Sequence, residues 1–297
     1  MEGNSYHFEG NKKRSKKKEE EKLDEELDEI LSGCEQLKRL DLSRTRITDR
    51  RLFNLSKLNK LFFLNLDETD IGDVCFKEVC KLSNLQRLPI NGIQVTDEGF
   101  KNLKDLNLLR IVSIRNTSIG NTAALSVFNL KNLTSLNLGY TQISDGGLIH
   151  LSHLRKLNKL FVNGLPITDR FMKHVESLTS LNMLFANYTS IGDEGLESIA
   201  KLPHLSNLQI SNNQITNFGT HYLSQMHSLQ KLNLRNTQIT DDGLMVLRKL
   251  PKLEHFILNN TVEGEIKKIE RSSMPESINQ TRYELIRKKI FITEKGI

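Results

Sequence analysis

Residues 133–154 read LTSLNLGYTQISDGGLIHLSHL, and the same arrangement of residue types returns every 24 positions along most of this chain. The stretch carries the positions that define one repeat: Leu133, Leu136, Leu138, Thr141, Ile143, Asp145, Leu148, Leu151 and Leu154. A fixed period of this length is typical of solenoids, in which each repeat packs only against its neighbours. The period therefore indicates the architecture before any other feature is considered.

Two columns show how regular the repeat is. One column is mostly threonine: Thr45, Thr69, Ile93, Thr117, Thr141, Leu165, Thr189, Asn213, Thr237 and Thr261. Two residues later a second column is aliphatic until Glu263 breaks it: Ile47, Ile71, Val95, Ile119, Ile143, Ile167, Ile191, Ile215 and Ile239. Because the period is unbroken, the length predicts one elongated domain rather than two.

Each repeat combines a strand with a helix. The opening L-x-x-L-x-L ends in the alternation expected of a strand with every second side chain buried. Leu148, Leu151 and Leu154 then recur at helical spacing on one buried face. We therefore predict an α/β fold: a right-handed solenoid (horseshoe) of ten 24-residue repeats. One parallel sheet should line its concave face, with the helices on its convex face.

Two polar columns have structural interpretations. The slot of Asp145 lies where a helix N-cap is expected, with the carboxylate accepting from exposed helix N–H groups. This slot is also filled by Asp49, Asp73, Asp97, Asn121, Asp169, Asp193, Asn217 and Asp241. The threonine hydroxyls should bond neighbouring backbone groups in the turn after each strand. Ile93 and Leu165 should interrupt that series.

The sequence divides into four segments. Residues 1–18 predict a disordered basic tail, because they are polar and highly charged. Residues 19–36 predict an N-terminal capping helix, 37–262 the repeat domain, and 263–297 a C-terminal cap with a short basic helix. A docking helix for a partner is the alternative interpretation of the last segment.

Charge and cysteine content restrict the class of partner and the compartment. The formal net charge is +6, and residues 12–18 alone carry six positive charges, so the rest of the chain is near neutral. Nucleic acid is therefore not the expected partner. The basic block is interpreted as a nuclear localisation signal, an anionic-membrane contact or a solvated tail. Three cysteines, without a secretory signal or apolar run, favour the cytoplasm or nucleus and predict no transmembrane segment.

Candidate chemistry is sparse. His150, His153 and His174 can lie near one another by their spacing, but scattered surface histidines are the simpler explanation. Cys75 and Cys80 have no second pair to complete a zinc site. We expect a protein that is not an enzyme, with no catalytic residue, metal, cofactor or small-molecule substrate.

The pattern L-x-x-L-x-L-x-x-T-x-I-x-D-x-x-L-x-x-L-x-x-L resembles the leucine-rich repeats of the ribonuclease-inhibitor-like superfamily. It is most similar to the GALA and cysteine-containing (F-box-type) variants, as in LNLGYTQISDGGLIHL and LNLRNTQITDDGLMVL. The resemblance covers about Leu37 to Thr261 and implies the same solenoid fold. Those variants occur in F-box substrate receptors and in effectors of bacteria that live inside eukaryotic cells, although we expect no F-box-like domain of its usual length before the repeats here.

The outward positions of the strands are the candidate contact surface. Aromatic residues and Met ringed by amides are typical of protein-binding hot spots. The candidate partner-binding residues are Phe63, Ile111, Asn137, Tyr140, Phe161, Asn163, Met183, Phe185, Asn187 and Tyr188. Two alternatives are that Phe161 and Phe185 only fill a tight concave curve, or that the face binds carbohydrate.

We therefore expect a protein–protein interaction module, adaptor-like or effector-like, that is monomeric alone and binds its partner through the concave face. The alternative is a substrate-receptor subunit of a ubiquitin ligase.

Overall fold

The computed structural model describes residues 5–7, 33–49, 52 and 54–258. These residues fall into two compact units. The first comprises Met1–Pro166 with Ser177–Leu181, and the second comprises Ile167–Glu176 with Asn182–Ile297.

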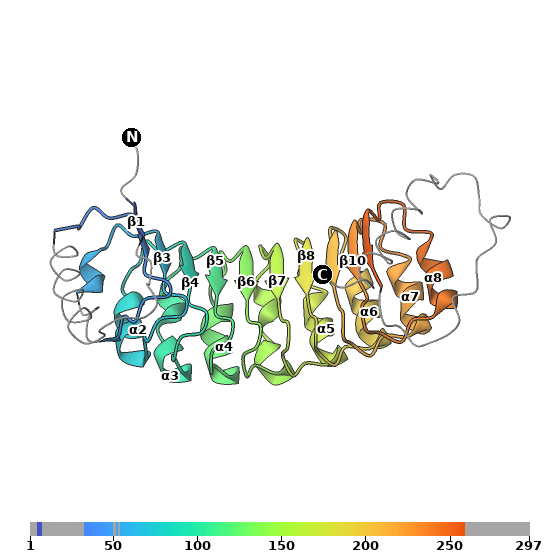
Figure 1. The fold of residues 1–297 in the computed structure, drawn as a ribbon, viewed down its shortest axis with the longest axis horizontal. Coiled ribbons are helices and arrows are strands. Elements are labelled where there is room, and N and C mark those ends of the chain that lie inside the picture. Colours follow the sequence, from blue (N-terminus) through green and yellow to red (C-terminus); the bar gives the residue numbers. More distant parts are fainter. Residues whose placement is uncertain (1–4, 8–32, 50–51, 53, 259–297) are drawn as a thin grey trace, which may run out of the picture. The chain divides into compact units, whose positions relative to one another are not determined.

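In the first unit, parallel strands follow one another in chain order (Figure 1). The strands are β1 (Ser5–His7), β2 (Arg39–Asp41), β3 (Phe63–Asn65), β4 (Arg87–Pro89), β5 (Ile111–Ser113), β6 (Ser135–Asn137) and β7 (Lys159–Phe161). The helices between them are η2 (Leu55–Lys57), α2 (Asp73–Val79), α3 (Asp97–Phe100), η3 (Leu103–Asp105), α4 (Asn121–Phe128), η4 (Asp145–Leu148) and η5 (Leu151–His153). From β2 onward the register pairs residues one repeat apart, as in Arg39 with Phe63 and Ser135 with Lys159.

The second unit repeats the same plan. Its parallel strands are β8 (Met183–Phe185), β9 (Asn207–Gln209), β10 (Lys231–Asn233) and β11 (His255–Ile257). Its helices are α5 (Asp169–Val175), α6 (Asp193–Ala200), α7 (Asn217–Leu223) and α8 (Asp241–Leu247). Strands β2 to β11 fall at the ten predicted positions, so the predicted α/β alternation of parallel strands and helices is confirmed.

The predicted segments at the two ends fall mainly outside the described residues. Ser5–His7 belong to the segment 1–18 and form strand β1, which pairs with β2 in parallel. The disorder predicted for the rest of that segment and the C-terminal cap of residues 263–297 lie outside the described range. So does most of the predicted capping helix of residues 19–36. These remain predictions.

The core lies between strands and helices. The middle residue of each strand from β2 to β10 is at most 2% exposed: Leu40, Leu64, Leu88, Val112, Leu136, Leu160, Leu184, Leu208 and Leu232. Leu148, Leu151 and Leu154 are also fully buried. Leu148 ends η4, Leu151 begins η5 and Leu154 is the C-cap of η5, because a spacing of three matches the tighter 3₁₀ turn better than the α-helix.

The threonine column behaves as predicted. Each threonine hydroxyl donates to the carbonyl oxygen three residues earlier at 2.6 to 3.0 Å, in Thr45, Thr69, Thr117, Thr141, Thr189 and Thr237. Asn213 takes the same slot, and its Nδ2 donates to the carbonyls of Ala186 and Ile210. Ile93 and Leu165 are buried there without a hydroxyl.

The aspartate column does not form the predicted N-caps. The N-cap of α6 is Gly192, and Asp193 is the first residue of that helix. Its carboxylate instead accepts from the backbone N–H of Thr216, the N-cap of α7 in the following repeat, at 2.9 Å. The same bond, at 2.6 to 2.9 Å, joins Asp49 to Gly72, Asp73 to Thr96, Asp97 to Gly120, Asn121 to Ser144, Asp169 to Gly192 and Asn217 to Thr240. The column therefore ties neighbouring repeats together.

Candidate binding surface on the open face of the sheet

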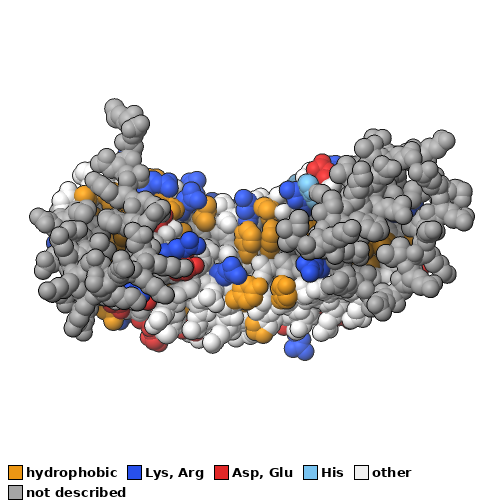
Figure 2. All heavy atoms as spheres, in the orientation of Figure 1, with side chains coloured by type: hydrophobic (Ala, Val, Ile, Leu, Met, Phe, Trp, Pro, Cys, Tyr) orange, Lys and Arg blue, Asp and Glu red, His pale blue; other side chains and the backbone are white. Residues whose placement is uncertain are grey.

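The open face of the sheet is the side turned away from the helices. In a typical strand the middle residue is buried and its two neighbours are partly exposed, as in Phe63–Asn65 and Ser135–Asn137. Figure 2 shows Lys and Arg side chains interleaved with apolar ones along the strand side of the molecule. This face is built from cationic and apolar groups rather than from one kind of side chain.

At the start of the first unit, Phe63 lies between two arginines. The guanidinium carbon of Arg39 is 4.4 Å from the centre of the Phe63 ring, and that of Arg87 is 5.6 Å from it. The three residues are neighbours across β2, β3 and β4. Cation–π contact holds the ring and both guanidinium groups in place.

Tyr140 is held in a similar way later in the same unit. The guanidinium carbon of Arg115 is 4.9 Å from the centre of its ring. The ring also lies against the backbone of Gly164, where an added Cβ would be 2.6 Å from two ring carbons. Gly164 therefore leaves the space that Tyr140 occupies, and the tyrosine is oriented while 42% exposed.

The residue directly before the threonine column has a left-handed backbone conformation in every repeat from Arg44 to Asn236. The φ angles are 54° to 68° at Arg44, Glu68, Gly92, Asn116, Tyr140, Gly164, Tyr188, Asn212 and Asn236. Gly and Asn favour this region, whereas tyrosine rarely adopts it. At Tyr140 and Tyr188 this backbone accompanies exposed rings, of which Tyr188 is 60% exposed. The sequence predicted a turn here, and the Gly and Asn residues of this column were the signal that its backbone is left-handed.

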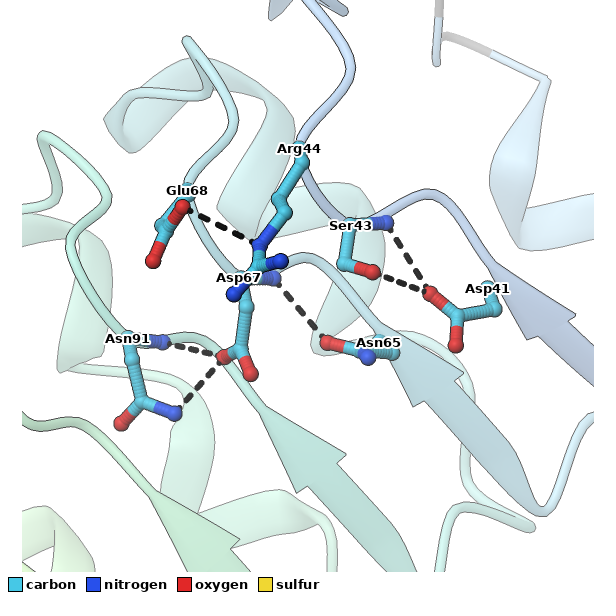
Figure 3. A network of polar contacts seen from close by, with 7 residues as sticks. All are labelled: Asp41, Ser43, Arg44, Asn65, Asp67, Glu68 and Asn91. Carbon is cyan, nitrogen blue, oxygen red and sulfur yellow. Dashed lines mark hydrogen bonds and ion pairs between the residues drawn. The ribbon is translucent and has the colours of Figure 1, made fainter. Parts of the chain in front are cut away.

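Polar side chains form a ladder beside the strands (Figure 3). Asp67 accepts from the backbone N–H of Asn91 at 2.7 Å and from its Nδ2 at 2.8 Å. Burial raises the pKa of Asp67 above its ordinary value, although the bonds from Asn91 oppose that shift. Asp41 accepts from Ser43, and Arg44 pairs with Glu68 at 3.3 Å. These contacts fix the loops that border the open face.

The predicted asparagines belong to the same kind of ladder. The Oδ1 of Asn137 accepts from the backbone N–H of Gly139 at 3.0 Å. The Oδ1 of Asn187 accepts from the backbone N–H and hydroxyl of Ser211, both at 2.8 Å. The backbone carbonyl of Asn163 accepts from the N–H of Tyr140 at 2.8 Å. The Oδ1 atoms of Asn137 and Asn187 hold their turns in shape, so a partner would meet side chains that already have a structural role, whereas the bond of Asn163 is made by its backbone.

The other predicted contact residues are placed unit by unit. In the first unit, Ile111 is half-buried on β5, and Phe161 is half-buried beside Asn137 across β6 and β7. In the second unit, Met183 and Phe185 are half-buried on β8 and pair in register with Asn207 and Gln209. Each unit therefore presents part of the predicted aromatic set on its own open face.

The candidate partner-binding residues chosen from the sequence did not include the arginines of this surface. Arg39, Phe63 and Arg87 lie one repeat apart in a single column, so their contact was readable from the 24-residue period. Arg115 and Tyr140 are 25 residues apart, and only the structure brings that diagonal pair together.

Other kinds of site are not evident in the part of the chain that the structure describes. Among those residues no group of three or more His, Cys, Asp or Glu side chains is arranged to hold a metal ion. The rings of His150 and His153 lie 5.4 Å apart. No helix within the described ranges has the length and apolar character needed to cross a membrane.

The repeats, their parallel strands and the open face define a leucine-rich repeat protein. Residues 22–288 match the family described as leucine-rich repeat region, and the chain belongs to that family. Among curated proteins none matches the sequence. Leucine-rich repeat proteins generally mediate protein–protein interaction.

Two bacterial internalins and a receptor are among the solved structures of similar fold. An internalin (inlF) of Listeria monocytogenes matches with a TM-score of 0.65 and 26% identity, over 79% of this chain and 64% of the internalin. An internalin C2 (inlC2) of the same organism matches with a TM-score of 0.56 and 21% identity, over 77% and 83% of the two chains. A TDR receptor matches with a TM-score of 0.56 and 17% identity, over 78% and 45%. The last two show similarity of fold alone.

Proposed function

We propose that this protein is a non-enzymatic interaction module, adaptor-like or effector-like, that binds a protein partner through the open face of its repeats. The observation that carries the proposal is the pre-arranged Tyr140, which Arg115 and Gly164 hold in place while much of its surface stays exposed. Tyrosine anchors fixed before binding lose little conformational entropy on association.

The remaining predicted contacts fit the same function. Phe161 lies on the open face of the first unit, and Met183 and Phe185 lie on that of the second, all half-buried. Half-buried aromatic residues and methionine are enriched at the centre of protein interfaces. Tyr188 adds an exposed ring in the second unit.

The test has two stages. Cross-linking of the full-length protein in cell extract, followed by mass spectrometry, would identify a partner, which is then purified for calorimetry. We expect the double variant Phe161→Ala, Phe185→Ala to lose about 2–4 kcal/mol of binding free energy, with Tyr140→Ala losing about 1–3 kcal/mol.

Asn233→Ala is the matched control, on the open face of the second unit. Its Oδ1 accepts a local bond from the N–H of Arg235, and truncating it removes no aromatic contact area, so partner affinity should change little. Melting curves of all variants separate lost contacts from lost structure. Wild-type affinity in both aromatic variants, with folds intact, would contradict the proposed site.

A substrate-receptor subunit of a ubiquitin ligase is the second candidate. It is favoured by the similarity of LNLGYTQISDGGLIHL to the F-box-type repeats. Co-purification of ligase subunits with the full-length protein would support it, whereas a partner complex without them supports the adaptor or effector function.

The proposed location is the cytoplasm, with entry to the nucleus through residues 12–18. Cys75 and Cys80 are buried free thiols, which suits a reducing compartment. Fluorescence microscopy of the tagged protein, with and without substitution of the basic block, tests both parts of this proposal.

A further inference from the structure

A patch of basic and aromatic side chains lies at the beginning of strands β2–β5 in the first unit. It consists of Lys38, Arg39, Phe62, Phe63, Arg87 and Arg110. Arg39, Phe63 and Arg87 are paired in register across three strands. One residue earlier, backbone N–H groups join the same strands, from Phe62 to Lys38 at 3.0 Å and from Arg110 to Gln86 at 2.8 Å. The patch is thus laid out in two rows by the repeat itself.

Aromatic rings hold two arginine side chains of the patch, Arg39 and Arg87, in place while their charges stay available. Arg39 approaches the rings of both Phe63 and Phe62, at 4.4 and 5.9 Å, and Arg87 approaches Phe63 at 5.6 Å. All four cations of the patch are exposed. Within the described ranges no carboxylate forms an ion pair with any of them. A guanidinium stacked on a ring leaves its N–H edges directed to solvent and able to form paired bonds.

The carboxylates that border the patch are already engaged. Asp41 accepts from the backbone and hydroxyl of Ser43, Asp67 accepts from Asn91, and Glu68 pairs with Arg44. They lie at or beyond the far ends of the strands, whereas the cations lie at the near ends. Among the described residues, the near edge of the open face therefore keeps positive charge that no ion pair neutralises.

We propose that this patch binds an acidic segment of the protein partner, one that carries a run of Asp and Glu residues. The proposal rests on the proposed function and names the chemistry of its partner. Arg39 and Arg87 are separated by two strand spacings, about 10 Å, so one acidic run can reach both. Each guanidinium then forms paired bonds to a carboxylate, and the half-buried ring of Phe62 can contact methylene groups of the segment.

Single-stranded nucleic acid fits this patch less well. A base needs a free aromatic face for stacking, and guanidinium groups approach the Phe63 ring from two neighbouring strands.

The test is fluorescence polarisation with the full-length protein and a labelled peptide of alternating Asp and Glu, about twelve residues long, at about 0.1 M salt. We expect Arg39→Ala with Arg87→Ala to weaken peptide binding by about tenfold or more. Lys77→Ala with Lys104→Ala is the matched control, because it removes two exposed cations of the same unit from the helix side. That control should change binding by less than about twofold.

A second variant pair keeps the test informative if the alanine variant does not fold. Arg39→Lys with Arg87→Lys preserves both charges but not the planar fork, and should weaken binding by about threefold to tenfold. Three results would overturn the inference: no binding of the acidic peptide by wild type, an equal loss in the patch variant and the control, or tighter binding of an oligothymidylate of similar length that the same substitutions abolish.

The acidic-segment inference and the proposed function can fail independently of each other. If the arginine variants bind the purified partner as wild type does while Phe161→Ala with Phe185→Ala loses affinity, the acidic-segment inference is wrong and the interaction module stands.

Discussion

Two neighbouring glycines in η4 provide a sharp test of how the repeats are joined. A Cβ added at Gly146 would meet only the Nδ2 of Asn121, at 3.7 Å. A Cβ added at Gly147 would overlap the Oδ1 of Asn121 and would lie 2.9 Å from its Cγ and 3.0 Å from its Cα. The same oxygen accepts from the backbone N–H of Ser144 at 2.9 Å, the bond that connects the two repeats. The two alanine substitutions therefore differ in one contact.

The two substitutions should change the free energy of unfolding in opposite directions. Gly→Ala inside a helical turn gains about 0.5–1 kcal/mol, because alanine has less backbone freedom to lose on folding. Gly146→Ala should therefore raise the free energy of unfolding by that amount. At Gly147 the overlap costs about 1–3 kcal/mol and the displaced bond about 0.5–1.5 kcal/mol. Gly147→Ala should therefore destabilise the protein by about 1–3 kcal/mol after its gain is included.

Urea unfolding followed by far-ultraviolet circular dichroism measures both variants. A double-mutant cycle with Asn121→Ala isolates the contact, since Gly147→Ala should become much less costly once the Asn121 side chain is gone. The column also holds Cys75, Ala123 and Phe171 in other repeats, so a side chain can be accommodated where the backbone shifts. If Gly147→Ala stabilises as Gly146→Ala does, or costs the same with and without Asn121, the reasoning is wrong.

Three other predictions concern the repeat ladder and its buried groups. Asp193→Ala removes acceptors for the backbone N–H and hydroxyl of Thr216, at 2.9 and 2.5 Å, and should destabilise by about 1–3 kcal/mol. In thermal melts Thr216→Ser should cost less, because it keeps the hydroxyl that donates to Asp193 and accepts from the backbone N–H of Phe218. Burial raises the pKa of the Cys75 and Cys80 thiols to about 12, so neither should react with a disulfide reagent near neutral pH until urea unfolds the protein, and rapid native labelling of either would contradict this. Burial also raises the pKa of Asp67 above its ordinary 3.8, so the folded protein holds the proton of this carboxyl more tightly than the unfolded chain does. The stability that comes from this proton is fully present below about pH 3.8 and is lost as pH rises through the folded pKa. Asp67→Asn, which cannot ionise, should therefore gain stability relative to wild type between about pH 3 and pH 7 in urea titrations, and a pH-independent difference would count against it.

The sequence by itself determined the repeat and its core. Columns such as Leu40, Leu64 and Leu88 recur every 24 residues, and a recurring apolar position has to be buried once repeats stack. The threonine bonds were also predictable, because Thr69 reaches a carbonyl three residues earlier in its own turn. Local contacts within one repeat depend on residues whose spacing is visible in the sequence.

Only the tertiary structure decided which residues meet between repeats. Asp193 was predicted to cap its own helix, yet its carboxylate bonds Thr216 of the next repeat, because the stacked helix brings that N–H group within reach. The ring of Tyr140 lies between Arg115 and Gly164 for the same reason, since the left-handed turn and the offset of neighbouring strands set its direction. The sequence lists the side chains of the open face, but the distances and angles between repeats decide which of them form a binding surface.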